Sequence, residues 1–310
     1  MEKQIFYDGN GQKVASCANV LAFGAIGDGV ADDTVAIQAA LDTKKQGGSV
    51  HFPAGIYKVT ASLRFYSNQA LMFEHGATIL QGAAINNLMM NDSTSDKGGY
   101  DATEHVLIDG ATFDGGSYSV NNTLFGICHS RHITIRNCRF VNAYGIWHNM
   151  EINSSKHVLI DGCYFEGSRK TGANGCMIQI DSFNNNATWP WGNGKVDGTV
   201  SYLVEVKNCM FTDCTTAPAI GNHSAAVVNG IRIHDNVFEN LTGSRGAINF
   251  QSANNVDVYS NTFIECTTGI TVDTADGTST VHDNRFLGVT TVSGAGIEVY
   301  QNMVNGVFTA

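Results

Sequence analysis

A short phrase recurs through most of this 310-residue chain, and it restricts the possible folds more than any other feature. The phrase alternates apolar and polar residues, continues with Asn, Asp or Gly and then a small residue, and closes on a phenylalanine. The recurrent phenylalanines are Phe113, Phe140, Phe165, Phe211, Phe238, Phe263 and Phe286, with spacings of 27, 25, 46, 27, 25 and 23 residues. A unit of about 25 residues suits three short strands with their turns.

Such a repeat predicts a solenoid. One unit cannot bury its own apolar side chains, so neighbouring units must stack and share a continuous core. The alternation is strand-like and no helical period competes with it. We therefore predict an all-β chain, a single-stranded right-handed parallel β-helix, with the phenylalanines stacked at the strand spacing of roughly 4.8 Å. The 46-residue spacing fits one coil plus an insertion.

The same register aligns a second column of small residues, which are Cys138, Cys163, Cys209, Asn236, Asn261 and Asn284. Stacked Asn side chains pair amide to amide, and a thiol fills the same small slot. The column therefore predicts a packing ladder with reduced cysteines. No Cys-x-x-Cys pair is present among the 8 cysteines, which disfavours a zinc site.

Composition narrows the possible partners. Charged residues make up only 15% of the chain, and 34 glycines against 3 prolines suit many short strands and turns. The net charge of −10 disfavours nucleic acid and anionic membranes, which need a basic face. No apolar run reaches bilayer length, and residues 1–4 lack the pattern of a signal peptide. We expect no signal peptide, no membrane insertion, no nucleic acid and no cofactor.

Ahead of the repeats, Asp32, Asp33 and Thr34 precede an apolar pattern typical of a short capped helix. We expect this helix to plug the open end of the solenoid, with Gly47 and Gly48 ending it and the first strand starting at Ser49. The predicted organisation is an N-terminal extension over 1–18, the capping helix and first coil over 19–60, and coils over 61–310. Insertions are expected near 91–104 and 183–199.

The opening of the chain also resembles that of the pectate-lyase-like superfamily. The resemblance is carried by residues 23–40, which begin Phe23-Gly24-Ala25-Ile26-Gly27-Asp28-Gly29, and by residues 48–57, which read Gly48-Ser49-Val50-His51-Phe52-Pro53-Ala54-Gly55-Ile56-Tyr57. It implies a right-handed β-helix that acts on polysaccharide, closest in style to phage tail-spike and exopolysaccharide depolymerases. It also implies a phage virion tail or an extracellular or cell-surface location. Tail spikes are commonly trimers, so a homotrimer is one of the open oligomeric states.

Candidate catalytic residues follow from aligning the strand that precedes each phrase. One outward row holds Glu151, Gln179, Gly221, Asn249 and Thr271, and the next holds Asn153, Asp181, His223, Gln251 and Asp273. Glu151 and Asp181 then lie one coil apart and two residues along, with Cα atoms about 8 Å apart. Paired carboxylates at such an offset are typical of glycoside hydrolases.

His223 would lie beside Asp181 and tune the pair, and His148 stands at the entrance of its strand as a fourth catalytic candidate. Gly221 is expected to keep the surface open above His223, so that a sugar ring can approach. Each residue also has a structural alternative. Asp181 could cap a turn, Glu151 could be a solvated strand residue, and His223 could bond to the backbone of a turn. For His148 the strand parity suggests an inward side chain, which a turn could reorient.

Substrate contacts are expected from aromatic and amide side chains near the acids. Trp189 and Trp191 lie in the polar insertion after Asp181, where their faces could stack on sugar C–H groups or pack on a neighbouring coil. The remaining candidates are Trp147, Arg245, Gln179, Asn249 and Gln251.

Three functions fit these observations. The first is a glycoside hydrolase cleaving a bacterial surface or extracellular polysaccharide. The second is a polysaccharide lyase, with His223 or His148 as base and Arg245 neutralising a uronate. The third is a non-catalytic carbohydrate-binding tail fibre. No metal is expected: Asp92, Asp96 and Asp101 could bind calcium, but a solvated loop is favoured.

Overall fold

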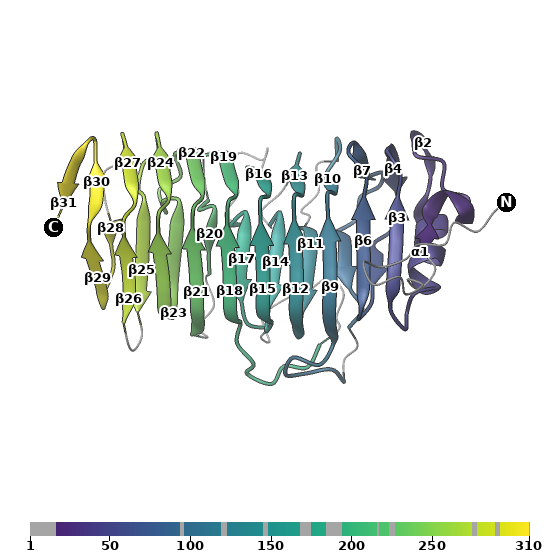
Figure 1. The fold of residues 1–310 in the computed structure, drawn as a ribbon, viewed down its shortest axis with the longest axis horizontal. Coiled ribbons are helices and arrows are strands. Elements are labelled where there is room, and N and C mark those ends of the chain that lie inside the picture. The colour runs from purple at the N-terminus through teal and green to yellow at the C-terminus, as the bar shows by residue number, and fades with distance from the viewer. Residues whose placement is uncertain are drawn as a thin grey trace, which may run out of the picture.

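The computed structural model describes residues 17–93, 96–118, 123–144, 148–167, 175–183, 194–215, 217–222, 227–274, 278–288 and 292–309. They wind into a long spiral with the N-terminal end and the C-terminal end at opposite tips (Figure 1). A typical coil contains three strands, as in β14 (Met150–Asn153), β15 (Lys156–Asp161) and β16 (Tyr164–Glu166). Equivalent strands of successive coils stack into three faces.

Face 1 is the stack that contains β14: β5 (Leu63–Phe65), β8 (Asn87–Asn91), β11 (Thr123–Cys128), β14, β17 (Ile178–Asp181), β20 (Ile220–Gly221), β23 (Ile248–Tyr259), β25 (Ile270–Thr274) and β28 (Val292–Ser293). Face 2 contains β15: β1 (Ala18–Asn19), β3 (Gly48–Phe52), β6 (Gln69–Phe73), β9 (Thr103–Asp109), β12 (Ser130–Arg136), β15, β18 (Tyr202–Lys207), β21 (Val228–His234), the second half of β23, β26 (Ser279–His282) and β29 (Ile297–Tyr300). Face 3 contains β16: β2 (Asp28–Asp32), β4 (Gly55–Val59), β7 (Ala77–Gln81), β10 (Thr112–Asp114), β13 (Arg139–Val141), β16, β19 (Met210–Cys214), β22 (Val237–Leu241), β24 (Thr262–Ile264), β27 (Arg285–Leu287), β30 (Asn302–Val304) and β31 (Val307–Thr309).

Hydrogen bonding joins faces 1 and 2 into one 19-stranded sheet, because β23 runs through both, and face 3 is a separate 12-stranded sheet. The described strand pairs are parallel except β30 with β31, which closes face 3 with an antiparallel hairpin. The predicted right-handed parallel β-helix is confirmed.

The predicted phenylalanine column runs through the core. Phe113, Phe140, Phe165, Phe211, Phe238, Phe263 and Phe286 pair in register along face 3. Their rings stack with centroids 4.7 to 5.1 Å apart, and every one of them is buried. Burying an aromatic side chain of this size contributes roughly 2–3 kcal/mol from removed apolar surface alone, so the column is a main source of cohesion between coils.

The Cys/Asn ladder is also confirmed, and it continues one coil further to Asn302. Each Asn amide nitrogen donates to the amide oxygen of the next coil at 3.0 Å, from Asn236 to Asn261, Asn284 and Asn302. All eight cysteines lie in the described part of the chain and carry free thiols. Burial raises the pKa of the Cys163 and Cys209 thiols, which keeps them protonated.

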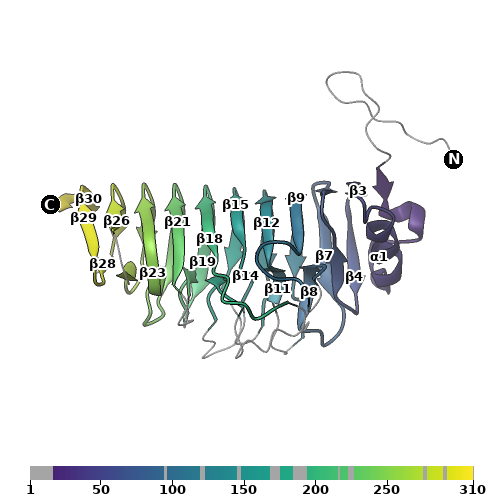
Figure 2. The same ribbon diagram turned by 90° about the horizontal axis from the view of Figure 1, so that it is seen from below.

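Helix α1 (Thr34–Asp42) lies across the N-terminal tip of the spiral, beside the short 3₁₀ helix η1 (Val20–Phe23), as Figure 2 shows. Ile37, Ala40 and Leu41 are its buried residues, and they cover the end of the core. The predicted plug is therefore present. Its expected bounds were partly wrong: the helix ends at Asp42, and β1 and β2 precede the strand expected to come first.

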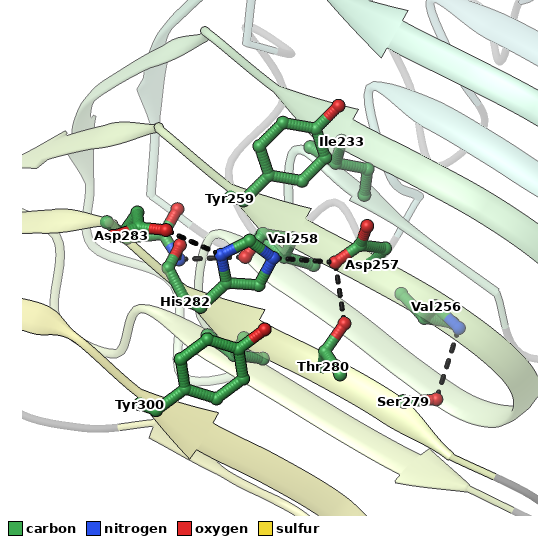
Figure 3. A network of polar contacts seen from close by, with 12 residues as sticks. Ile233, Val256, Asp257, Val258, Tyr259, Ser279, Thr280, His282, Asp283 and Tyr300 are labelled. Carbon is green, nitrogen blue, oxygen red and sulfur yellow. Dashed lines mark hydrogen bonds and ion pairs between the residues drawn. The ribbon is translucent and has the colours of Figure 1, made fainter. Parts of the chain in front are cut away.

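Outward side chains of face 2 form a column of stacked rings near the C-terminal tip. His234, Tyr259, His282 and Tyr300 have centroids 4.6, 5.3 and 4.8 Å apart in turn. Figure 3 shows His282 between two carboxylates, with Nε2 3.2 Å from Asp257 and Nδ1 2.7 Å from Asp283. His234 repeats this arrangement, with Glu205 at 2.9 Å and Asp235 at 2.7 Å.

Candidate functional site

Strands β14 and β17 of face 1 carry the two candidate acids. Met150, Ile152, Ile178 and Ile180 point into the core and are fully buried. Since side chains alternate along a strand, Glu151 and Asp181 belong to the outward set. This alternation of apolar and polar residues positions both carboxyl groups on one side of the spiral.

The register across face 1 agrees with the alignment made from the sequence. Glu151 pairs with Gln179, Gln179 with Gly221, Gly221 with Asn249, and Asn249 with Thr271. In the second row Asn153 pairs with Asp181. The two acids therefore lie on neighbouring coils, displaced by two residues.

Glu151 lies in a partly buried position that favours its neutral form. Burial raises the pKa of its carboxyl group to about 8, and the negative charge of Asp181 acts in the same direction. A hydrogen bond of 2.9 Å from the Asn153 amide to Oε1 of Glu151 opposes the shift without cancelling it. Glu151 can therefore hold a proton near neutral pH, as a general acid must.

Asp181 is only 5% exposed and is held by donors on both carboxylate oxygens. The amide of Gln179 donates to Oδ2 at 2.6 Å, and the backbone N–H of Ser182 donates to Oδ1 at 2.9 Å. Within the described part of the chain, Oε1 of the buried Gln179 has no hydrogen-bond partner. An unpaired acceptor beside two carboxyl groups is a site where a hydroxyl donor would bind.

His148 is buried, with 7% of its surface exposed, and its Nδ1 donates to the backbone oxygen of Cys176 at 2.8 Å. The ring thus connects its coil to the next one. The bond fixes Nδ1 as the protonated nitrogen, and the role of His148 as a base remains a prediction.

Arg245 and the amide candidates lie further along face 1. The guanidinium of Arg245 is partly buried, and its Nη2 lies 3.4 Å from Oδ1 of Asn249. Gln251 is exposed in the outward row. Gly221 does not form the expected opening: it is buried, and a Cβ atom there would lie 2.2 Å from the backbone oxygen of Asn249. Close approach of the two coils requires this glycine.

Four of the candidates, Trp147, Trp189, Trp191 and His223, lie outside the described residues. Their predicted roles therefore remain predictions.

Sequence reasoning missed a packed assembly between the two insertions. The backbone N–H of Lys195 donates to the oxygen of Lys97 at 2.7 Å, and the N–H of Gly99 donates to the Asp197 carboxylate at 2.7 Å. Figure 1 shows the two loops running together below the coils that carry β9 to β18. Residues 97–101 and 194–200 are named here the paired loops.

The paired loops cover His129, a residue that was not among the candidates. Its Nδ1 donates to the oxygen of Gly99 at 2.8 Å, and its ring meets Phe183 edge-on at 5.8 Å. In the described chain the buried Nε2 of His129 has no partner. The paired loops also cover Cys128, which lies beside Gly194 and is buried. In the later coils, the outward residues Gln251 and Asp273 are exposed. Residues 128–130 align with residues 153–155 of the next coil, and this alignment could have identified His129 from the sequence.

Among the described residues, no group of His, Cys, Asp and Glu is arranged to hold a metal ion. Asp92 lies 3.7 Å from Arg64, and Asp101 lies 3.1 Å from Arg131, so these two carboxylates face arginines. Within the same residues, no helix has the length and apolar character needed to cross a bilayer.

Comparison with known families gives two matches. Residues 17–237 match the model of the family described as rhamnogalacturonase A/epimerase, pectate lyase-like. Residues 192–306 match the model of the periplasmic copper-binding protein NosD family, which covers a smaller part of the chain.

Among curated proteins, the chain is 31% identical over 260 residues to plasmin and fibronectin-binding protein A of Streptococcus pneumoniae. The match covers 72% of this chain but 36% of that protein, so the chain spans about a third of its relative's length. A segment of 44 residues is 59% identical to mannuronan C5-epimerase AlgE1 of Azotobacter vinelandii, covering 14% of this chain and 3% of the epimerase.

Solved structures support the same architecture. The crystal structure of PfbA, a surface adhesin of Streptococcus pneumoniae, superposes with a TM-score of 0.77 and 24% identity, over 93% of this chain and 78% of that one. An exopolygalacturonase from Thermotoga maritima superposes with a TM-score of 0.51 and 13% identity, over 100% of this chain and 94% of that one. At these identities the likeness shows the fold alone.

Proposed function

Because the chain belongs to the rhamnogalacturonase A/epimerase, pectate lyase-like family, we propose that it is a polysaccharide depolymerase, a glycoside hydrolase that uses Glu151 and Asp181. The proposal rests most on one observation: Glu151, with a pKa raised to about 8, lies one coil from a second carboxylate. A carboxyl group that keeps its proton near neutral pH beside a second carboxyl group is typical of acid–base pairs.

In the proposed reaction Glu151 donates its proton to the glycosidic oxygen as the bond to the anomeric carbon breaks. Asp181 takes a proton from a water molecule, whose oxygen bonds to that carbon. The Cα separation of about 8 Å lets the carboxyl groups reach the roughly 6.5–9.5 Å typical of inverting enzymes. Gln179 and Asn153 hold the two carboxyl groups in position.

A lyase is a weaker proposal. One of its two candidate bases, His148, is buried, with only 7% of its surface exposed. The candidate uronate ligand Arg245 is directed at Asn249. A lyase would release unsaturated sugars that absorb ultraviolet light, so the same assay separates the two reactions.

A non-catalytic role is the second candidate, and one observation favours it. The relative that is 31% identical over most of this chain is named for binding plasmin and fibronectin. In this proposal the outward rows of face 1 hold a glycan without cleaving it. Both proposals place the protein at a bacterial or phage surface with polysaccharide as its partner, and a homotrimer would suit a tail spike.

The decisive experiment compares four proteins on a panel of bacterial exopolysaccharides, with product analysis by mass spectrometry. These are the wild type, Glu151→Gln, Asp181→Asn and the control Asp273→Asn, which changes an exposed carboxylate of the same outward row. We expect the first two variants to lose activity by about 10²–10⁴-fold, and the control to keep it. Equal rates for all four would refute the site. Unchanged polymer length with retained binding would favour the non-catalytic role.

A further inference from the structure

Face 2 carries a column of three histidines to which no function has been assigned. His105, His132 and His157 occupy equivalent positions in β9, β12 and β15, and all three are exposed. Their rings stack nearly parallel, with centroids 4.9 and 4.8 Å apart. These three residues are named here the histidine ladder.

The corner that carries the ladder has a left-handed backbone. The φ angles of His105, His132 and His157 are 55°, 56° and 53°. Other coils have Asn68, Leu203, Gly230 and Asn255 at the same corner, so the conformation belongs to the corner, and histidine is one of the residues that tolerate it.

A hollow of about 520 Å³ lies against the ladder. Ala70, Leu107 and Thr134 form an outward row that lines it, and these small or apolar side chains suit the C–H face of a sugar. The imidazole groups supply hydrogen-bonding edges along the same hollow. Ser49, Asn68 and Gln69 add further polar groups to the lining of this open hollow.

The central histidine of the ladder is harder to protonate than a free imidazole. Desolvation lowers the pKa of His132, and the positive charges of His157, His105, Arg131 and Lys156 act in the same direction. Of the neighbouring acids, Glu104 lies 2.7 Å from Arg131 and 3.8 Å from Nε2 of His105. Asp101 pairs with Arg131 at 3.1 Å, and Asp109 pairs with Arg136 at 2.7 Å. Lys156 lies over the ring of Tyr100 at 4.5 Å. An anion in the hollow would offset the repulsion between neighbouring imidazolium groups.

We propose that this hollow binds one sugar-acid unit of an acidic glycan, with its carboxylate on the edges of His105, His132 and His157. The ligand binds best when the ladder is protonated, so its affinity rises as the pH falls through the histidine range and is lost as the pH rises again. The site lies on face 2 and is separate from the acid pair of face 1. It therefore anchors a chain rather than cleaving it.

The test uses a trimer of galacturonate as the probe and the Glu151→Gln, Asp181→Asn double variant as the protein, so that no cleavage and no titration of Glu151 interferes. Calorimetry should show affinity at least about ten-fold higher near pH 5.5 than near pH 7.5, with proton uptake on binding. The same trimer with its carboxyl groups reduced to alcohols should show no such dependence.

Matched variants assign the effect to the ladder. His132→Asn keeps a residue that tolerates the left-handed conformation and should remove most of the pH dependence. The control His75→Asn changes an exposed histidine outside the ladder and should leave it intact. Binding that is equal at both pH values, or unchanged in His132→Asn, would overturn the proposal. Because the readout is binding by an inactive variant, this result is independent of whether the wild type cleaves polysaccharide.

Discussion

Asn153 pairs in register with Asp181 across β14 and β17, while its own amide donates a 2.9 Å hydrogen bond to Glu151. The Asn153 side chain thus lies between Glu151 and Asp181 and contacts Glu151, the acid on its own strand. The bond stabilises the charged form of Glu151 and lowers its pKa, against the larger effect of burial.

Replacing this donor should change the protonation of Glu151. In Asn153→Val the hydrogen bond to the carboxylate is lost, so we expect the pKa of Glu151 to rise above its value of about 8. If Glu151 is the general acid, the alkaline limb of the pH–rate profile moves to higher pH. Carboxyl-carbon NMR titration measures the same shift without activity. A pKa that falls in Asn153→Val would contradict this account.

The raised pKa of Glu151 also predicts how stability depends on pH. An unfolded Glu has a pKa of about 4.3, so between that value and about 8 the unfolded state releases a proton that the folded state retains. Folding stability therefore falls as the pH rises through this window. Glu151→Gln should match the wild type in melting temperature near pH 4 and become relatively more stable towards pH 8. The control Asp273→Asn should show no such trend, and a difference that is constant with pH would rule the explanation out.

The amide ladder should tolerate truncation poorly. Asn261 donates to Asn284 and to the backbone oxygen of Ile233, and its own oxygen accepts from Asn236. Asn261→Ala leaves these buried groups unpaired and should cost about 2–4 kcal/mol in unfolding free energy. Asn229→Ala, which removes one outward-facing amide, should cost about 0.5 kcal/mol or less. Chemical denaturation measures the unfolding free energy of both variants. Similar losses in the two would show that the amide ladder stabilises the fold no more than an outward-facing amide does.

The thiols should be inert in the folded protein. Seven of the eight cysteines are buried, and burial raises the pKa of Cys176 to about 12. We expect a thiol reagent at mildly alkaline pH to label at most Cys17 before unfolding and all eight residues after it. A reducing agent should leave the melting temperature unchanged. Fewer than eight titrated thiols in the unfolded, unreduced protein would reveal a disulfide.

The stacked rings of Figure 3 should stabilise the C-terminal coils. His282→Gln removes the ring between Tyr259 and Tyr300 together with its contacts to Asp257 and Asp283. Because these groups are partly exposed, the expected loss is modest, about 1 kcal/mol. Hydrogen exchange should increase in β26 and β29 while β9 and β12 stay protected. Uniform loss of protection along the chain would indicate that the coils do not unfold separately.

The sequence was sufficient for features that depend on the repeat alone. The positions of Phe113 to Phe286 define the coil length, and alternation within each strand then assigns Glu151 and Gln179 to the same outward row. Neither step needs knowledge of a neighbouring side chain. The first strands were missed because β1 and β2 precede the repeat and carry no phenylalanine of that series.

Features that depend on contacts between distant segments were not predictable. Lys97 and Lys195 meet through backbone groups, about which side-chain identity says nothing. Gly221 was interpreted as an opening, because the closeness of the Asn249 backbone cannot be read from one strand. The raised pKa of Glu151 likewise depends on how deeply its row is covered.

The phenylalanine column makes the molecule a rod with a set pitch. Rings in contact at 4.7 to 5.1 Å leave no room for neighbouring coils to slide closer together or drift apart. Distances between groups on the outside therefore change in whole steps, when a coil is gained, lost or interrupted by an insertion. A relative that needs a wider gap between two reacting groups would reach it by using a different coil, so duplication of coils is a more direct route to new spacing than substitution within one.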